Sequence, residues 1–487
     1  MSGPDPAAGP APAAPHSTET SAAETSARAG AAAPALHEVL VLAAAAWLGV
    51  QGGQSLDRAL ETVLQPNSGT GPGRAPADQA RLGGAVRDLA AATVRRAATV
   101  DFLLTRLLHR APDAAVSGLL AVGIAQLLAR SYADFTLVDQ AVRAARAQPN
   151  TAAASGLVNA VLRAFLRQRD VLEAEAGADP QRRFNVPAWW LRRLQAEYGK
   201  RTTALLAAQL EEPPLVLRVN GRRASVAQML ERLRQQDMAA VQVGPSAIWL
   251  QRAVPVERIP GFLEGWVSVQ DAGAQLAGPL LDVAAGMRVL DVCAAPGGKT
   301  AQLLEMADCS VDAVEFDPQR ARRIGANLER LGLAGPNARV VVADALDPPA
   351  YWNGVPYDRI LLDAPCTASG VVRRHPDVVL LRRESDVAKL ATQQAKMLQT
   401  LWPLLAPAGR LLYVVCSVFA EEGRRQVSAF LQRQPGARSV RIPGDDPAGL
   451  QLLPCAIAPT TGPAAQPADA AIPVLHDGFF YALLEKT

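Results

Sequence analysis

Residues 287–300 read Met-Arg-Val-Leu-Asp-Val-Cys-Ala-Ala-Pro-Gly-Gly-Lys-Thr, and this stretch decides the fold of the C-terminal part of the chain. The run from Met287 to Val292 predicts a strand, and the glycines of the turn after it let the backbone approach a ligand closely. The segment from Lys299 predicts a helix, whose start offers free backbone N–H groups. Ligands of a doubly wound sheet bind outside the carboxyl ends of its strands. We therefore expect a ligand site at this turn.

Two common phosphate-binding motifs do not match the turn. A P-loop needs a glycine five residues before its Gly-Lys pair, and Cys293 stands at that position. A dinucleotide-binding fingerprint needs Gly-x-Gly-x-x-Gly after a strand, which Ala294-Ala295-Pro296-Gly297-Gly298 does not supply. The turn therefore favours another kind of ligand.

Acidic residues follow the next predicted strands. The strand from Ser310 to Phe316 places Glu315 about two dozen residues after Asp291, where an acid commonly binds ribose hydroxyls. The strand from Arg339 to Ala343 brings Asp344 to the same edge, near the expected position of an adenine amino group. Apolar runs at 340–342 and 360–362 are typical of parallel strands covered on both faces. The groups expected together at this edge are Asp291, Glu315, Asp344, Asp363 and Cys416.

Two cysteines end predicted strands in the last third of the chain, Cys366 in Leu-Leu-Asp-Ala-Pro-Cys and Cys416 in Leu-Tyr-Val-Val-Cys-Ser. Carbon 5 of cytosine is a poor nucleophile, so a thiolate must first add to carbon 6 and make carbon 5 enamine-like. A proton donor near ring nitrogen 3 and a later base complete such a reaction. Beside a site for S-adenosylmethionine, Asp363 and the two thiols could cover these roles. The combination favours methylation of a pyrimidine carbon.

Three motifs together resemble those of the RNA cytosine-C5 methyltransferases. They are residues 291–300, the run 363–377, and Cys416-Ser417 followed by Glu421-Glu422. The resemblance covers roughly residues 36–440 and the final Asp-Gly-Phe-Phe-Tyr at 477–481. Within the family, the chain is most similar to the bacterial enzymes of small-subunit ribosomal RNA.

The resemblance implies roles for particular residues. Cys416 falls at the position of the nucleophile and Cys366 at that of the cysteine that helps to release the product, and the chemistry above makes Asp363 the third catalytic candidate. Glu315 replaces a commoner Asp, and Val415 replaces a commoner Thr before the nucleophile. The residues implied to bind S-adenosylmethionine are Cys293, Ala294, Ala295, Pro296, Gly297, Gly298, Lys299, Glu315, Asp344 and Asp363. The residues alone leave open whether Lys299 contacts the cofactor or the target base.

The remaining cysteines have a simpler interpretation. Cys293 and Cys309 fit small packing residues, and five cysteines without regular spacing favour neither a disulfide framework nor a zinc site. We therefore expect no metal and a reducing compartment. The longest apolar run near the N-terminus, 39–50, has 12 residues and is too short to cross a membrane. Together these features predict a cytoplasmic protein without a membrane segment, which we expect to be a monomer.

The composition predicts a multidomain chain. Residues 1–35 are an Ala/Pro-rich tail that cannot bury enough apolar surface to order itself. Residues 36–172 show helical spacing of apolar residues, and the resemblance implies an all-α, NusB-like RNA-binding domain. Residues 173–270 predict a connector and a small α+β subdomain, and residues 271–487 an α/β, Rossmann-like methyltransferase domain with a flexible insertion at 456–473.

Several residues outside the motifs are candidates for RNA contact. Residues 160–235 contain 14 Lys or Arg against 8 Asp or Glu, although the net charge of the whole chain is only +3. Such residues either track phosphates or lie on solvated helix faces. Trp189, Trp190 and Tyr198 either stack on bases or pack in a core. Arg373 and Arg374 either clamp phosphates of the substrate or are solvated, and His375 is interpreted as a positioning residue. The basic stretch includes Arg163, Arg167, Arg169, Arg182, Arg183, Arg192 and Arg193.

The leading hypothesis is a 16S rRNA (cytosine-C5)-methyltransferase that uses S-adenosylmethionine, binds small-subunit ribosomal RNA and forms a covalent bond between cysteine and cytosine. A second hypothesis keeps this chemistry on transfer RNA or another RNA, and the helical N-terminal domain argues against it. A third is a non-catalytic ribosome-assembly factor that binds RNA. The intact Cys366, Cys416 and Asp363 argue against the third.

Overall fold

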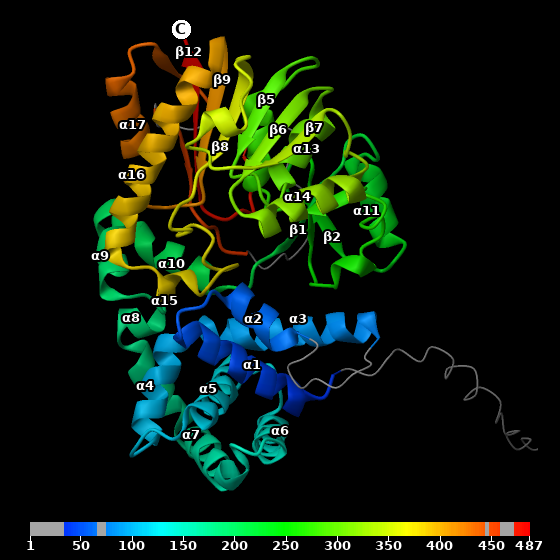
Figure 1. The fold of residues 1–487 in the computed structure, drawn as a ribbon. Helices are drawn as coiled ribbons and strands as arrows, with labels where there is room; N and C mark the ends of the chain where they lie inside the picture. Colours follow the sequence, from blue (N-terminus) through cyan, green and yellow to red (C-terminus); the bar gives the residue numbers. More distant parts are fainter. Residues whose placement is uncertain (1–33, 66–74, 444–447, 458–471) are drawn as a thin grey trace, which may run out of the picture.

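The computed structural model describes residues 34–65, 75–443, 448–457 and 472–487. The predicted N-terminal tail and the predicted insertion at 456–473 fall almost wholly outside these residues. The described chain forms a helical N-terminal domain, a small middle subdomain and a large α/β domain (Figure 1).

The N-terminal domain is helical throughout, as the spacing of its apolar residues predicts. Helix α5 is apolar on all sides and largely buried, as expected for a helix at the centre of a bundle. Trp47, Leu120 and Phe165 belong to the same hydrophobic core around it. The helices are α1 (Leu36–Gln51), α2 (Leu56–Leu64), α3 (Pro76–Val94), α4 (Ala97–Leu107), α5 (Ala114–Ala129), α6 (Asp134–Ala147) and α7 (Ser155–Gly177).

The middle region contains α8 (Pro180–Arg183), α9 (Ala188–Tyr198), α10 (Thr202–Leu210) and α11 (Val226–Arg234). Its antiparallel sheet has the order β2-β3-β1-β4, formed by β1 (Leu215–Val219), β2 (Ala240–Gln242), β3 (Ala247–Leu250) and β4 (Val267–Val269). The packing interpretation of the aromatic residues on α9 is confirmed for two of them, because Trp190 and Tyr198 are buried. The centroid of the Trp190 ring lies 5.1 Å from that of Phe419 in the α/β domain.

The α/β domain contains a mixed sheet with the order β10-β12-β9-β8-β5-β6-β7, and β11 pairs with β12. The five strands from β9 to β7 in this order are parallel, and β12 runs antiparallel to β9. Its strands are β5 (Arg288–Val292), β6 (Ser310–Glu315), β7 (Ala338–Val342), β8 (Tyr357–Asp363), β9 (Leu405–Val415), β10 (Ala437–Val440), β11 (Leu450–Leu452) and β12 (Phe479–Lys486).

Helices cover both faces of this sheet, which explains the continuous apolar runs of its strands. One core packs Val289 and Leu361 against α12 (Ala277–Leu281), α13 (Gly298–Met306) and α14 (Pro318–Leu331). The other packs Leu290 and Ile360 against α16 (Glu384–Leu401) and α17 (Arg424–Arg433). The chain runs from β5 to β6 and β7 on one side and returns to β8 on the other. This topological switch point is the usual place for a ligand.

The helical domain contacts the loop that follows Cys366 in the sequence. The backbone N–H of Leu56 donates a hydrogen bond to Asp377 Oδ2 at 3.1 Å, and Arg95 Nη2 donates one to the carbonyl oxygen of Arg373 at 2.8 Å. This loop runs into the short helix α15 (Val378–Leu381), which lies next to the helical domain (Figure 1). The helical domain therefore lies beside the carboxyl edge of the sheet.

Candidate active site

The turn after β5 has a backbone that only glycine accommodates at Gly297. Its φ is +94°, and a Cβ there would lie 3.1 Å from the backbone Cα of Ile324. Asp291, the last but one residue of β5, is fully buried, and Thr300 Oγ1 donates a hydrogen bond of 2.6 Å to its Oδ2. The other oxygen, Oδ1, is buried without a hydrogen-bond partner among the described residues. Burial raises the pKa of Asp291 to about 7, against the opposing effect of the Thr300 hydrogen bond.

Glu315, at the end of β6, fixes the conformation of two neighbouring loops. Its buried carboxylate accepts hydrogen bonds from the backbone N–H groups of Ala295 at 3.2 Å and Asp317 at 3.1 Å. The Arg320 guanidinium lies 3.5 Å from Oε1. Since each carboxylate oxygen has two lone pairs, Glu315 retains capacity to accept hydrogen bonds from a ligand.

A cavity of about 610 Å³ lies at the carboxyl ends of β5, β6, β7 and β8, within the size range of small-molecule sites. Sequence reasoning missed Phe316 in its wall, although the sequence shows an aromatic residue directly after Glu315. The Phe316 side chain is 73% exposed. The predicted residues that line the cavity are Cys293, Ala295, Glu315, Asp344, Asp363, Cys366 and Cys416. The predicted residues Ala294, Pro296, Gly297, Gly298 and Lys299 form the adjoining turn and the start of α13.

The two predicted thiols lie together in this cavity. The Sγ atoms of Cys366 and Cys416 are 3.3 Å apart and share a hydrogen bond. This hydrogen bond raises the pKa of Cys366 well above its ordinary value, and burial of Cys366 raises it further. Cys366 is buried and Cys416 is partly exposed. The protonated form of Cys366 is therefore favoured, and the partly exposed Cys416 lies directly beside it.

Lys299 and Asp363 form an ion pair beside the thiols. Lys299 Nζ donates a hydrogen bond of 2.6 Å to Asp363 Oδ2. Burial lowers the pKa of Lys299, but the charges of Asp363 and Cys416 outweigh burial, and the net shift is upward. Lys299 is therefore a stable cation. Its direct partner in this structure is Asp363.

Glu422 joins the two loops that carry the cysteines, a role that the sequence did not reveal. Its buried carboxylate accepts hydrogen bonds from Thr367 N at 2.9 Å, Thr367 Oγ1 at 2.5 Å and Ser417 Oγ at 2.6 Å. Gln394 Nε2 donates a further hydrogen bond at 3.2 Å. Burial raises the pKa of Glu422, while these hydrogen bonds oppose the rise. Thr367 follows Cys366 and Ser417 follows Cys416, so the Glu422 side chain fixes the positions of the two thiols relative to each other.

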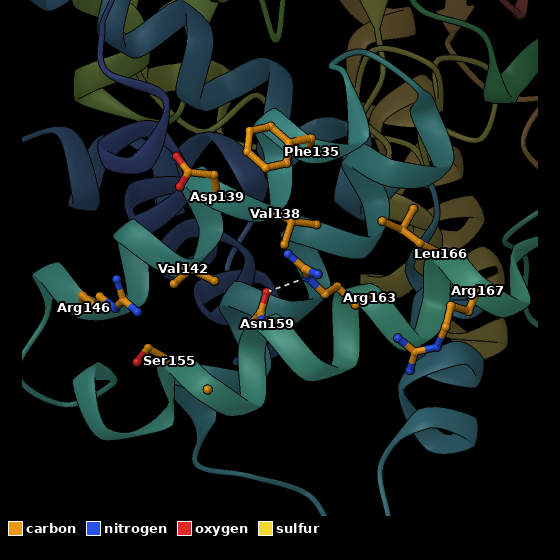
Figure 2. A pocket seen from close by; sticks show the side chains of 11 residues that line it. Phe135, Val138, Asp139, Val142, Arg146, Ser155, Asn159, Arg163, Leu166 and Arg167 are labelled. Carbon is orange, nitrogen blue, oxygen red and sulfur yellow. Dashed lines mark hydrogen bonds between the residues drawn. The ribbon is translucent and has the colours of Figure 1, made fainter.

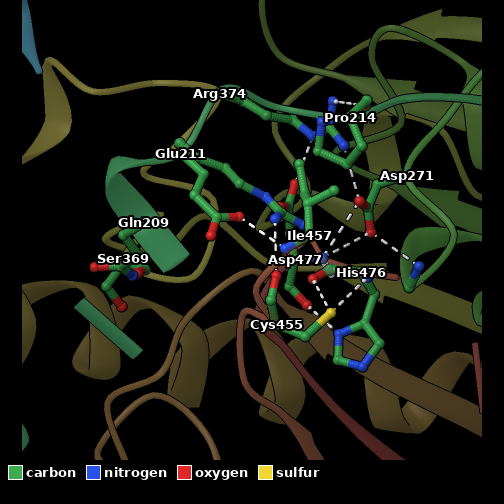
Figure 3. Close-up of polar contacts among 12 residues, drawn as sticks. Gln209, Glu211, Pro214, Asp271, Ser369, Arg374, Cys455, Ile457, His476 and Asp477 are labelled. Atoms are coloured by element: carbon green, nitrogen blue, oxygen red, sulfur yellow. Dashed lines mark hydrogen bonds and ion pairs between the residues drawn. The ribbon is translucent and has the colours of Figure 1, made fainter. Parts of the chain in front are cut away.

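The interpretation of Arg373 and Arg374 as phosphate clamps is wrong. Arg373 is fully buried and ion-paired with Asp477. Arg374 donates to Asp477 and, at 2.9 Å, to Asp271, as Figure 3 shows. The arginines therefore connect the loop after Cys366 to the residues before β12. His375 lies on the same loop, with its Nδ1 4.0 Å from Asp57 of the helical domain.

The other cysteines do not join the thiol pair. Cys309 is buried and contacts the carbonyl oxygen of Leu303, and Cys455 contacts the backbone of His476. Within residues 34–65, 75–443, 448–457 and 472–487, no three or more His, Cys, Asp or Glu side chains are grouped as metal ligands. The same residues include no helix with the length and apolar character needed to cross a membrane.

Comparison with known proteins places each domain. Residues 279–485 match the model for the 16S rRNA methyltransferase RsmB/F family, residues 186–257 match its ferredoxin-like domain, and residues 50–167 match the NusB family. The crystal structure of PH0851 has a TM-score of 0.72 at 22% sequence identity and covers 92% of this chain and 98% of that one, which shows the same fold.

Two curated relatives carry the name ribosomal RNA small subunit methyltransferase B. The protein of Pseudomonas syringae pv. tomato is 40% identical, covering 83% of this chain and 89% of its own length. The protein of Citrobacter koseri is 38% identical, covering 90% and 96%. The chain therefore belongs to the family of ribosomal RNA small subunit methyltransferase B.

Proposed function

We propose that this chain is an S-adenosylmethionine-dependent 16S rRNA (cytosine-C5)-methyltransferase that bonds Cys416 covalently to carbon 6 of the target cytosine. The observation that carries the proposal is the pair of thiols 3.3 Å apart in a cavity that also contains Asp363. Family membership supports the substrate. Free cysteines suit a reducing compartment, and we propose that the protein acts in the cytoplasm as a monomer.

The residues of the cavity fit S-adenosylmethionine, which supplies an electrophilic methyl group when bound. Glu315 has spare lone pairs for ribose hydroxyls. Asp344 is exposed, and its Oδ1 accepts a hydrogen bond of 2.9 Å from the backbone N–H of Leu346. Phe316 offers an exposed aromatic face in the same wall.

Cys416 is the better nucleophile of the two thiols. It is the more exposed of the two, and the Cys366 Sγ at 3.3 Å and the Lys299 cation would stabilise a negative charge on its sulfur. Attack forms a bond between Cys416 Sγ and carbon 6, and the electron pair of the 5,6 double bond moves toward carbon 5 and the ring. This makes carbon 5 nucleophilic enough to accept a methyl group.

Asp363 and Cys366 serve the later proton transfers. Lys299 occupies one oxygen of Asp363, so the other oxygen is available to form a hydrogen bond at ring nitrogen 3. After methylation, Cys366 gives its proton to the departing sulfur of Cys416 and takes up the proton of carbon 5, and the electron pair of that C–H bond restores the 5,6 double bond as the bond to Cys416 breaks. Cys366 already hydrogen-bonds with Cys416 and is placed to assist the departure of that sulfur.

The test is a denaturing gel of wild type, Cys366→Ala and Cys416→Ala after incubation with unmodified small-subunit rRNA and labelled S-adenosylmethionine. We expect Cys366→Ala to accumulate a covalent protein–RNA adduct, because attack proceeds while release is impaired. We expect Cys416→Ala to form none and to transfer no label.

Cys309→Ala is the matched control, because Cys309 is a buried cysteine outside the cavity, and it should behave as wild type. Methyl transfer by Cys416→Ala would overturn the assignment of the nucleophile. Transfer to transfer RNA in preference to small-subunit rRNA would overturn the assignment of the substrate.

A further inference from the structure

A groove of about 680 Å³ lies between α6 and α7 in the helical domain. The residues that line it from each helix are spaced three or four positions apart and so share one face. Arg146 and Arg167 lie at opposite ends of the groove with Arg163 between them, as Figure 2 shows. Phe135, also in the lining, is 79% exposed. The groove thus combines three cations with an exposed aromatic ring.

The three groove arginines have no ion-pair partner among the described residues, unlike several other arginines of the same domain. Arg163 Nε donates only to the amide oxygen of Asn159, at 3.1 Å. A guanidinium that is not neutralised by a carboxylate binds a phosphate without first breaking an existing pair. The paired arginines of the domain are Arg81 with Asp78, Arg87 with Asp57, Arg106 with Glu175, Arg130 with Glu173 and Arg169 with Asp134.

We infer that the groove between α6 and α7 binds a single strand of RNA, with its phosphates on Arg146, Arg163 and Arg167 and a base stacked on Phe135. Positive charge along a groove together with an aromatic platform is the combination that single-stranded nucleic acids require. Asp139, the carboxylate of the lining, is available to accept a hydrogen bond from a sugar hydroxyl or a base amino group.

The groove is a second contact, separate from the catalytic cavity. The face of α6 from Phe135 to Arg146 is about 16 Å long, which accommodates about four stacked nucleotides at about 3.4 Å each. Helices α6 and α7 lie on the side of the helical domain away from the large sheet (Figure 1). The strand in the groove is therefore a segment flanking the target cytosine. This inference rests on the proposed function for the identity of the RNA.

The test measures binding of an unmodified small-subunit rRNA fragment at several salt concentrations. All proteins carry Cys416→Ala, so that no turnover interferes. Replacing Arg146, Arg163 and Arg167 together by Ala should weaken binding at least tenfold and reduce the slope of log affinity against log salt by about 2 to 3, at about 0.7 to 0.9 per phosphate. Phe135→Ala should weaken binding about fivefold or more with an unchanged slope.

Arg106→Ala is the matched control, because Arg106 is an exposed arginine of the same domain that is paired with Glu175, and it should bind as the parent does. Unchanged affinity and slope in the triple variant would overturn the inference. So would a loss confined to assembled subunits with naked RNA unaffected, because the occupant would then be a protein. If wild type methylates no RNA but the triple variant still loses RNA affinity, the proposed function is wrong and the inference that the groove binds RNA is retained.

Discussion

Replacing Glu422 should damage both the stability and the rate of this enzyme. Glu422→Ala removes the acceptor of four hydrogen bonds that hold the loops of Cys366 and Cys416. The hydroxyls of Thr367 and Ser417 are 3.4 Å apart and can turn to each other. The Thr367 N–H has no such replacement, and the Gln394 amide keeps only its second hydrogen bond, to the carbonyl oxygen of Pro365 at 2.9 Å.

The expected loss of stability follows from the hydrogen-bond donors that lose their acceptor. Each buried donor left without a partner costs about 1–3 kcal/mol, and removing a buried carboxylate whose pKa is raised returns part of that cost. The net loss is about 3 kcal/mol, which lowers the melting temperature of a domain of this size by about 6 to 12 °C. A shift of about 1 Å between the two sulfur atoms would lower the rate about 100-fold.

Thermal unfolding and single-turnover methyl transfer, measured at a temperature where the variant is folded, check both effects. Glu421→Ala is the matched control, because the neighbouring Glu421 pairs with Arg193 and Arg425 in a partly exposed setting and should cost about 1 kcal/mol or less. Glu422→Gln keeps one acceptor oxygen and should fall between the two. A Glu422→Ala enzyme that melts within about 2 °C of wild type, or that is destabilised but fully active, would refute the positioning role.

Two further predictions concern the turn after β5. Burial raises the pKa of Asp291 to about 7, so the folded state keeps a proton that the unfolded state releases near pH 4. The stability that this group contributes is therefore present at low pH and declines as the pH rises toward 7. Asp291→Asn should remove about 3 kcal/mol of the decline between pH 5 and pH 8, measured by urea unfolding without cofactor, and equal declines in the two proteins would contradict this. Gly297→Ala should reduce affinity for S-adenosylmethionine at least tenfold by calorimetry, because its Cβ would press on the Ile324 backbone, whereas Gly325→Ala, which meets open space, should bind normally.

The arrangement of strands, turn and helix around the candidate site could be predicted because much of it depends on local sequence. The strand that contains Asp291 and the helix after Lys299 are encoded within a dozen residues, and parallel strands bring Glu315, Asp363 and Cys416 to one edge of the sheet whatever their separation in the chain. Helical spacing likewise identified the N-terminal domain. The predicted domain boundaries and the individual cofactor contacts stay predictions.

The sequence by itself thus determined the order of domains, the strand–turn–helix of the site and the identity of its two thiols. Only the tertiary structure decided which charged side chains form ion pairs with other residues. Arg373 and Asp477 are 104 residues apart in the chain, yet they form a buried pair. Arg163 and Arg169 share one helix, yet only Arg169 meets a carboxylate. A charged side chain looks the same in any sequence, whereas its availability depends on neighbours that folding brings from distant positions.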